Sequence, residues 1–266
     1  MENEQVALCS ISSSAENDSV KLDKVGSDVT NIDNDNTSFS EGTLTDVVAV
    51  NDGLELANNP ALSFDGVDDY VDLNTTSNFN LSDSNGDLPC TIIANVIPQS
   101  NEPLVIFSKT TGTEATWEWF FKIENGCTMA FRLYSGRGGD TLLKRVNLPY
   151  ITNMSVAATY DGSKEVSGIN LYVDGNLITD INEITNTNYT KAINNTSKAI
   201  IGAFDYNGTY EIMSKGIQDN TSFWNYEMTQ QEIQDNMNKE LNGDEEGLVA
   251  YYKLPPLFIL CISSHN

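Results

Sequence analysis

Short runs of β-branched, aromatic and alternating residues fill the sequence from residue 60 onward, and they constrain the fold more than any other feature. The runs are ALSFDG, DYVDL, PCTIIANVI, LVIFSK, WEWFFKI, TMAFRLY, NMSVAATY, INLYVDG and KAIIGAF. Such runs are typical of β-strands, and the DG, NG and GN pairs after them supply the positive φ angles that hairpin turns require. Because no helical pattern separates these runs, the sequence predicts an all-β sandwich of two antiparallel sheets.

One short helix is expected near the C-terminus, in the segment TQQEIQDNMNKELNG. Thr229 and Glu232 have the spacing of a capping box, and Gly243 follows the last expected turn. Ile233, Met237 and Leu241 repeat every four residues. This spacing gives the helix a narrow apolar face, which we expect to lie against the outside of a sheet.

The chain is strongly acidic, with 38 Asp and Glu against 14 Lys and Arg and a net charge of −24. Such a charge repels nucleic-acid phosphates and anionic membranes, so we expect neither as a partner. The longest apolar stretch, LPPLFILCIS, contains two prolines and is too short to span a bilayer. No signal peptide is visible at the acidic N-terminus. The excess of carboxylates has two possible roles. It keeps a secreted or virion-surface protein soluble, or it binds divalent cations.

Several motifs resemble the laminin G-like jelly-roll domain of the concanavalin A-like lectin/glucanase superfamily. ALSFDGVDDYVDL resembles the opening strand pair of that family, and NMSVAATYDGS followed by INLYVDGNLI resembles its paired inner strands. GIQDNTSFWNYEMTQQEI resembles the last core strand with the following helix, and EEGLVAYYKL the closing strand. The resemblance implies a concanavalin A-like jelly roll over residues 58–254.

The remaining residues are expected to lie outside this domain. Residues 1–57 are rich in Ser, Asn and Asp, have Phe39 as their only aromatic residue and show no sustained periodicity, so we expect a disordered arm or a linker. Residues 255–266 are apolar and unlike the acidic, glycine-containing continuation of the family. We interpret them as a truncated, frameshifted or otherwise atypical tail.

The resemblance implies a non-catalytic binding or adhesion module that recognises a glycan or a cell-surface or matrix protein. It also implies an extracellular, cell-surface or virion-associated location. Two alternatives stay open, because this fold serves many functions. The domain could be a structural spacer or decoration of a larger surface or virion assembly, or a glycoside hydrolase.

Catalytic motifs are missing from the expected domain. The sole histidine, His265, lies in the tail, so a Ser-His-Asp or Cys-His arrangement has no histidine among the strands. The ExDxE and ExDxxE runs of the related laminarinase-type hydrolases do not occur. The cysteines have no zinc-binding spacing and are expected to be reduced thiols. We therefore expect that the protein is not an enzyme.

Calcium is the candidate cofactor, and the acidic residues Asp65, Asp68 and Asp69 are its candidate ligands. Hard cations prefer carboxylate and carbonyl oxygens of loops such as this one. The resemblance adds Asp219, at a position where the family commonly carries an acid. The alternative is that Asp65 and Gly66 form a turn and that the other carboxylates are solvated.

Aromatic residues supply the candidate ligand-binding surface. Trp117, Trp119 and Phe121 alternate in WEWFFKI and are expected on one face of a strand, where they either stack on sugar rings or pack in the core. Tyr134 and Arg137, in the loop LYSGRGGD, are the other candidate ligand contacts. For this loop the alternative is a flexible hairpin.

Overall fold

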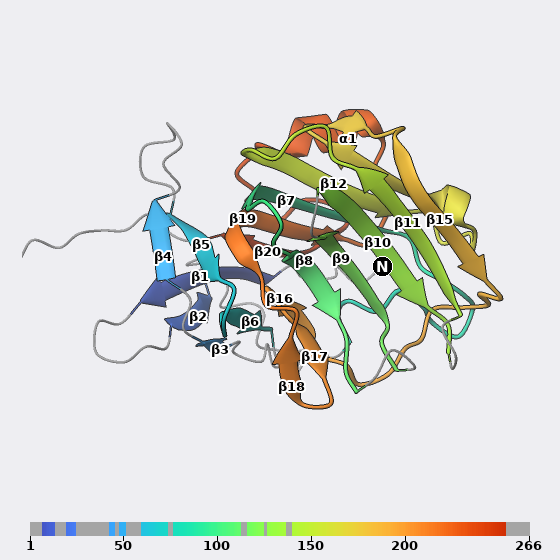
Figure 1. The fold of residues 1–266 in the computed structure, drawn as a ribbon, viewed down its shortest axis with the longest axis horizontal. Coiled ribbons are helices and arrows are strands. Elements are labelled where there is room, and N and C mark those ends of the chain that lie inside the picture. Colours follow the sequence, from blue (N-terminus) through green and yellow to red (C-terminus); the bar gives the residue numbers. More distant parts are fainter. Residues whose placement is uncertain are drawn as a thin grey trace, which may run out of the picture.

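The computed structural model describes residues 7–13, 20–24, 43–45, 48–51, 60–73, 77–112, 116–124, 127–136 and 140–253. These residues form a sandwich of two largely antiparallel sheets (Figure 1). The first sheet has the strand order β14–β13–β12–β7–β19, and the far edge of β19 pairs with β5 and β20. Its strands are β5 (Pro60–Asp65), β7 (Cys90–Pro98), β12 (Met154–Tyr160), β13 (Ile169–Val173), β14 (Asn176–Leu177), β19 (Lys215–Trp224) and β20 (Leu248–Lys253).

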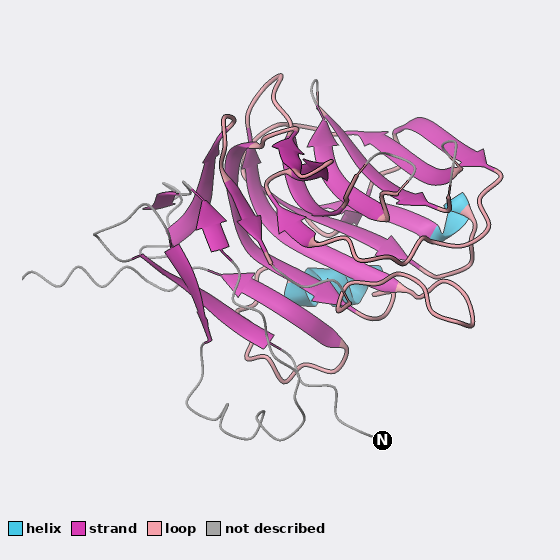
Figure 2. Ribbon diagram, turned by 90° about the horizontal axis from the view of Figure 1, so that it is seen from below, coloured by secondary structure: helices cyan, strands magenta, loops and turns pink. Residues whose placement is uncertain are grey.

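The second sheet has the order β15–β11–β10–β9–β8–β16–β6. It comprises β6 (Tyr70–Asp72), β8 (Leu104–Lys109), β9 (Trp119–Glu124), β10 (Thr128–Tyr134), β11 (Thr141–Asn147), β15 (Ile181–Thr187) and β16 (Ala199–Ile201). A separate hairpin, β17 (Phe204–Tyr206) with β18 (Thr209–Glu211), lies beyond β16. Figure 2 shows that strands make up most of the described residues and that the helical segments are short. The predicted all-β sandwich is therefore confirmed.

Four short strands fall within residues 1–57, where the sequence predicts an arm or linker. They are β1 (Ala7–Ser13), β2 (Val20–Lys24), β3 (Thr43–Thr45) and β4 (Val48–Asn51). β1 runs parallel to β20, β3 pairs with β6, and β4 pairs with β5. Edge strands are added by backbone hydrogen bonds, so they need no apolar periodicity that a sequence would reveal. The boundaries 1–57, 58–254 and 255–266 stay a prediction.

The main hydrophobic core lies between the two sheets. The first sheet contributes alternate residues such as Ile92, Val156 and Phe223, and the second contributes Trp119 and Phe131, all of them buried. Phe79 packs edge-on against Phe107 and Phe223, with ring centroids 5.0 and 5.1 Å apart. Each strand thus sends every second side chain inward, as the period of two requires.

The single α-helix of the described residues, α1 (Gln230–Asn236), lies on the outer face of the first sheet (Figure 1). The predicted capping box is present, because Thr229 Oγ1 accepts from the Glu232 backbone N–H and Glu232 Oε2 accepts from the Thr229 N–H. Buried Ile233 and Leu241 pack against this face. The helix is shorter than predicted, since it ends before the asparagine-rich segment that follows, and asparagine favours turns over helix interiors. No described helix is long and apolar enough to cross a membrane.

Two strands of the second sheet were not among the predicted runs. β11 has the sequence TLLKRVN and β15 has INEITNT. β15 is largely exposed and mostly polar, so its sequence has little of the apolar alternation that marks a buried strand. These two strands carry much of the candidate site described below.

Candidate functional site

Three cations lie on neighbouring strands of the second sheet, on the face that points away from the core. They are Lys122 of β9, Arg132 of β10 and Arg145 of β11. Ala130 lies between Lys122 and Arg145 in the strand register, and its small side chain leaves room for the two longer ones. We call this surface the polar face, and we define it by Lys122, Glu124, Arg132, Arg145 and Glu183.

Two carboxylates hold Arg145 in place. Glu124, on β9, accepts from Arg145 Nε, and its Oε1 lies 3.2 Å from both Arg145 Nη2 and Lys122 Nζ. Glu183, directly opposite Arg145 on β15, accepts from Arg145 Nη1. Burial raises the pKa of Glu124, but the hydrogen bonds and charges of Arg145 and Lys122 outweigh this effect and lower the pKa. Glu124 is therefore held as a carboxylate.

Arg132 is the cation of the polar face that has no carboxylate partner within ion-pair distance among the described residues. Its guanidinium lies 4.5 Å from the centroid of the Tyr134 ring, and its Nε donates to Thr141 Oγ1 at 3.0 Å. These contacts fix the guanidinium and leave its Nη groups for another acceptor. Burial, followed by the charges of Arg145 and Arg132, lowers the pKa of Lys122 despite the attraction of Glu124. The polar face thus combines three cations with two carboxylates, on a chain of net charge −24.

None of the residues that define the polar face was predicted from the sequence as a site residue. A usable signal existed in the predicted strands, because Lys122, Glu124 and Arg132 occupy the positions that alternate with apolar residues in WFFKIE and TMAFRLY. Arg145 and Glu183 lie on the two strands that the sequence did not predict. The clustering across four strands depends on the register of the sheet.

The two candidate tryptophans are buried. Trp119 is fully buried in the core, and its Nε1 donates to the Phe79 carbonyl at 2.9 Å. Trp117 is 6% exposed and packs on the opposite side of the sheet, with Phe204 5.2 Å away. The prediction that Trp117, Trp119 and Phe121 share a face is wrong for Trp117, because β9 begins only at Trp119 and the strand alternation does not extend back to residue 117. Neither indole offers a broad exposed surface to a sugar ring.

The other two candidate ligand contacts have different outcomes. Tyr134 is fully buried beneath Arg132, so it supports the polar face from below. Arg137 lies outside the described residues. Neither role in ligand binding is tested by these positions.

The acidic residues Asp65, Asp68 and Asp69 come together in the turn after β5. One oxygen from each carboxylate lies within 4.8 Å of the other two. Asp65 and Asp68 are exposed, whereas Asp69 is 3% exposed and accepts from the Asp65 backbone N–H at 2.7 Å. Asp65 also accepts from the Val67 N–H, as in an ordinary Asx turn. The triad could hold a hard cation such as calcium, and the turn is also explained without one.

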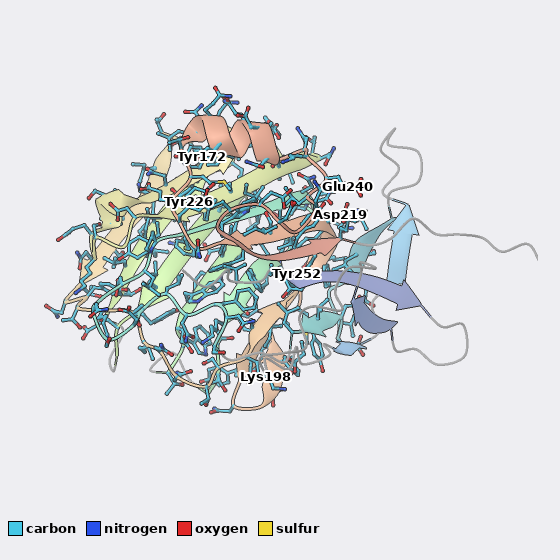
Figure 3. The ribbon with its side chains drawn as sticks, turned by 180° about the vertical axis from the view of Figure 1, so that it is seen from behind. Tyr172, Lys198, Asp219, Tyr226, Glu240 and Tyr252 are labelled. Carbon is cyan, nitrogen blue, oxygen red and sulfur yellow. The ribbon has the colours of Figure 1, made fainter. Side chains whose placement is uncertain are left out.

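Asp219 does not belong to this triad. It lies on β19 four residues after Lys215, the residue that pairs with Asp65. Burial, followed by the charges of Asp219 and Glu240 (both labelled in Figure 3), raises the pKa of Tyr251. The resemblance implied that Asp219 faces the same region as the acidic triad, but the extended strand β19 carries it away from the triad.

Comparison with known proteins identifies the family. The profile of the Laminin_G_3 family, described as the Concanavalin A-like lectin/glucanases superfamily, matches residues 64–234. No curated protein matches the chain.

Among solved structures, one from Bacteroides ovatus described as a carbohydrate-binding protein is 20% identical with a TM-score of 0.50. The alignment covers 74% of this chain and 52% of that protein, so the chain spans about half its length.

Two further structures are more distant. The Ruminococcus gnavus IT-sialidase CBM40 bound to α2,3 sialyllactose is 14% identical, with 56% and 82% of the two chains covered and a TM-score of 0.44. The SAP-like pentraxin from Limulus polyphemus is 12% identical, with 68% and 82% covered and a TM-score of 0.44. Because the family profile covers more than half of the chain, the protein belongs to the laminin G-like family of the concanavalin A-like lectin/glucanases superfamily.

Proposed function

We propose that the protein is a non-catalytic carbohydrate-binding module and that its polar face binds a glycan carrying a carboxylate or sulfate group. One observation carries the proposal. Arg132 lies over Tyr134 with no carboxylate partner among the described residues, next to Lys122 and Arg145, on a chain that is otherwise strongly acidic. A planar guanidinium held in this way suits the bidentate recognition of an anionic group.

The strong negative charge of the whole chain restricts where an acidic glycan can bind. An acidic glycan is repelled by most of the surface and attracted to Arg132, whose charge is not paired with a carboxylate of the described residues. Hydrogen bonds to charged groups contribute about 1.5–3 kcal/mol each, so loss of the Arg132 contact is expected to weaken binding by about ten- to a hundredfold.

The test compares sialyllactose, a sulfated oligosaccharide and lactose by titration calorimetry. We expect binding of an acidic sugar, no measurable binding of lactose, and loss of binding in Arg132→Ala. The matched control is Lys198→Ala, because Lys198 also belongs to a part-exposed cluster but pairs with Asp72 at 2.6 Å, away from the polar face. Equal binding of neutral and acidic sugars, or unchanged binding in Arg132→Ala, would contradict the proposal.

The state of Glu124 supports a non-catalytic role. A glycosidase needs one protonated carboxyl group to act on the leaving oxygen. Glu124 is held ionised and Glu183 shares the same arginine, so the polar face has a poor candidate for that acid. Incubation with each bound oligosaccharide should therefore leave the oligosaccharide intact, which chromatography of the products would check.

We also propose that calcium binds the acidic triad and assists the module. Calcium at a hundredfold excess over its dissociation constant would stabilise the native state by about 2.7 kcal/mol. Thermal unfolding with calcium and then with a chelator should show this as a reversible shift, abolished in Asp68→Asn and retained in Asp83→Asn, a substitution in a different exposed turn. No shift in the unaltered protein would leave the triad as a solvated turn.

The burial of both tryptophans favours a second candidate, a structural spacer or decoration of a surface or virion assembly. With Trp117 and Trp119 packed inside, the aromatic platform expected of a lectin is missing from these positions. The absence of binding across a broad panel of neutral and acidic glycans would favour this function. Either function suits an extracellular, cell-surface or virion-associated location, with a glycan or a surface protein as the partner.

A further inference from the structure

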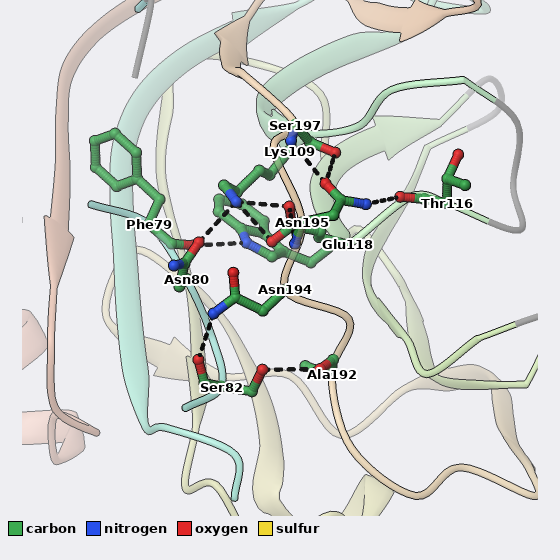
Figure 4. Close-up of polar contacts among 11 residues, drawn as sticks. Phe79, Asn80, Ser82, Lys109, Thr116, Glu118, Ala192, Asn194, Asn195 and Ser197 are labelled. Carbon is green, nitrogen blue, oxygen red and sulfur yellow. Dashed lines mark hydrogen bonds and ion pairs between the residues drawn. The ribbon is translucent and has the colours of Figure 1, made fainter. Parts of the chain in front are cut away.

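A fully buried ion pair lies where β8 ends and β9 begins. Lys109 is the last residue of β8, and Glu118 directly precedes β9. Lys109 Nζ lies 2.6 Å from both carboxylate oxygens of Glu118, and both side chains are 0% exposed (Figure 4). Burial of two charges is costly even when they are paired, so their retention needs an explanation.

An asparagine amide completes the cluster. Asn80 Oδ1 accepts from Lys109 Nζ at 2.8 Å, and the amide carbon Cγ, bonded to this oxygen, lies next to the lysine nitrogen. Buried Lys109 and Glu118 thus meet the half-buried Asn80 at one point. Reacting atoms that are held in contact gain an effective molarity far above that of free reactants.

The surrounding structure holds the asparagine in position. Trp119 Nε1 donates to the carbonyl of Phe79, the residue before Asn80, at 2.9 Å. Ser82 is tied to the segment that follows β15, since its hydroxyl donates to the Ala192 carbonyl and its own carbonyl accepts from Asn194 (Figure 4). The Asn80 amide is therefore held against Lys109 from both sides along its chain.

The carboxyl group of Glu118 is also fixed. Its Oε1 accepts from the Asn195 backbone N–H at 3.2 Å, and the Asn195 side chain donates to the Thr116 carbonyl at 2.6 Å (Figure 4). The Asn195 amide oxygen is occupied by Ser197. Asn80 is therefore the amide of this cluster that the lysine contacts.

We propose that Lys109 and Asn80 form an intramolecular isopeptide bond and that Glu118 is its catalytic acid–base. The uncharged Lys109 nitrogen attacks Asn80 Cγ, so the Nζ–Cγ bond forms and the Cγ–Nδ2 bond breaks. Glu118, which holds the proton received from the lysine ammonium, gives that proton to Nδ2, which leaves as ammonia, and takes one proton from Nζ in return. Nothing is oxidised or reduced, and no co-reactant is needed.

The protonation that this step requires is favoured by the site. Burial lowers the pKa of Lys109 more than the charge of Glu118 raises it, and burial raises the pKa of Glu118 more than Lys109 lowers it. Both changes favour transfer of a proton from the ammonium to the carboxylate. The lysine then has the lone pair that a nucleophile needs, and the carboxyl group has the proton that an acid needs.

Intact-mass measurement of the full-length protein is the first test. We expect a mass lower than that of the sequence by one ammonia. Asn80→Ala removes the amide while leaving the ion pair, so it should have the mass of its sequence. Asn80→Asp is the rescue, because condensation with loss of water gives the same product and therefore the same final mass as the unaltered protein.

Proteolysis locates the bond. An acylated Lys109 is not cut by trypsin, and the sequence has no lysine or arginine between Lys24 and Lys109, so the tryptic fragment should extend to Lys122. A protease that cuts before Asp83 and Asp87 separates Asn80 from Lys109 along the chain, and the two fragments should stay joined. Full sequence mass with complete cleavage after Lys109 would overturn the proposal.

Glu118→Gln tests the catalytic part. It keeps the lysine and the asparagine but has no carboxyl group, so the folded variant should retain its ammonia. Loss of ammonia from Glu118→Gln at the rate of the unaltered protein would overturn the role of Glu118. A fold check by circular dichroism on each variant keeps this result separate from misfolding, and the mass of the unaltered protein decides the bond by itself.

Discussion

Two ion pairs of the second sheet differ in their surroundings more than in their chemistry. The pair of Lys109 and Glu118 has no exposed surface, whereas the side chains of Arg145 and Glu124 are 21% and 20% exposed. Burial moves the pKa of Glu118 up, and the cations beside Glu124 move its pKa down. The comparison shows that a glutamate paired with a cation is sealed in the interior in one place and part-exposed in another.

The largest expected difference concerns stability. Lys109→Met leaves Glu118 buried without a cation, and breaking a buried pair in this way costs about 3–5 kcal/mol. Urea unfolding of the variant should show this loss. Lys109→Met combined with Glu118→Leu should recover only the part of the loss that is due to the uncompensated charge, because neither variant can form the proposed isopeptide bond. A loss below about 1 kcal/mol in the single variant would mean that the two pairs are energetically alike.

The corresponding change on the polar face is expected to be small. Arg145→Ala removes the partner of Glu124 and Glu183, but exposed or part-exposed pairs contribute about 0–1 kcal/mol. The same urea measurement should therefore show little change, while binding of an acidic glycan weakens. A loss of stability as large as that in Lys109→Met would contradict the distinction between a structural and a ligand-binding pair.

The smallest expected effect is a difference in the sign of pH dependence. The pKa of Glu118 is raised above 4.5 in the folded state, so its contribution to stability is present below pH 4.5 and is lost as the pH rises through the folded value. The pKa of Glu124 is lowered, so its contribution is present above pH 4.5 and is lost as the pH falls through the folded value.

Urea unfolding on both sides of pH 4.5 checks these signs. As the pH rises, the free energy of unfolding of Glu118→Gln should increase relative to that of the unaltered protein. That of Glu124→Gln should decrease relative to the unaltered protein. If this stability difference changed with pH in the same way for both variants, the two carboxyl groups would have similar environments.

The candidate sites were predictable to different degrees. The acidic triad was accessible from the sequence because Asp65, Asp68 and Asp69 belong to one turn. The polar face and the Lys109 cluster were not, because their members come from strands and loops distant in the chain. Asn80 and Glu118 meet at Lys109 only after the sheet has formed and a loop has packed against its edge.

The sequence alone determined the all-β sandwich, the position of most central strands and the cap of α1, since these depend on local alternation, turn residues and the Thr229–Glu232 spacing. The tertiary structure decided which face of each strand is covered. Alternation tells which side chains share a face, but not whether that face meets another sheet, a loop or solvent. Trp119 therefore lies in the main core, Trp117 in a second apolar cluster and Lys122 on the half-buried polar face, although all three come from one short segment.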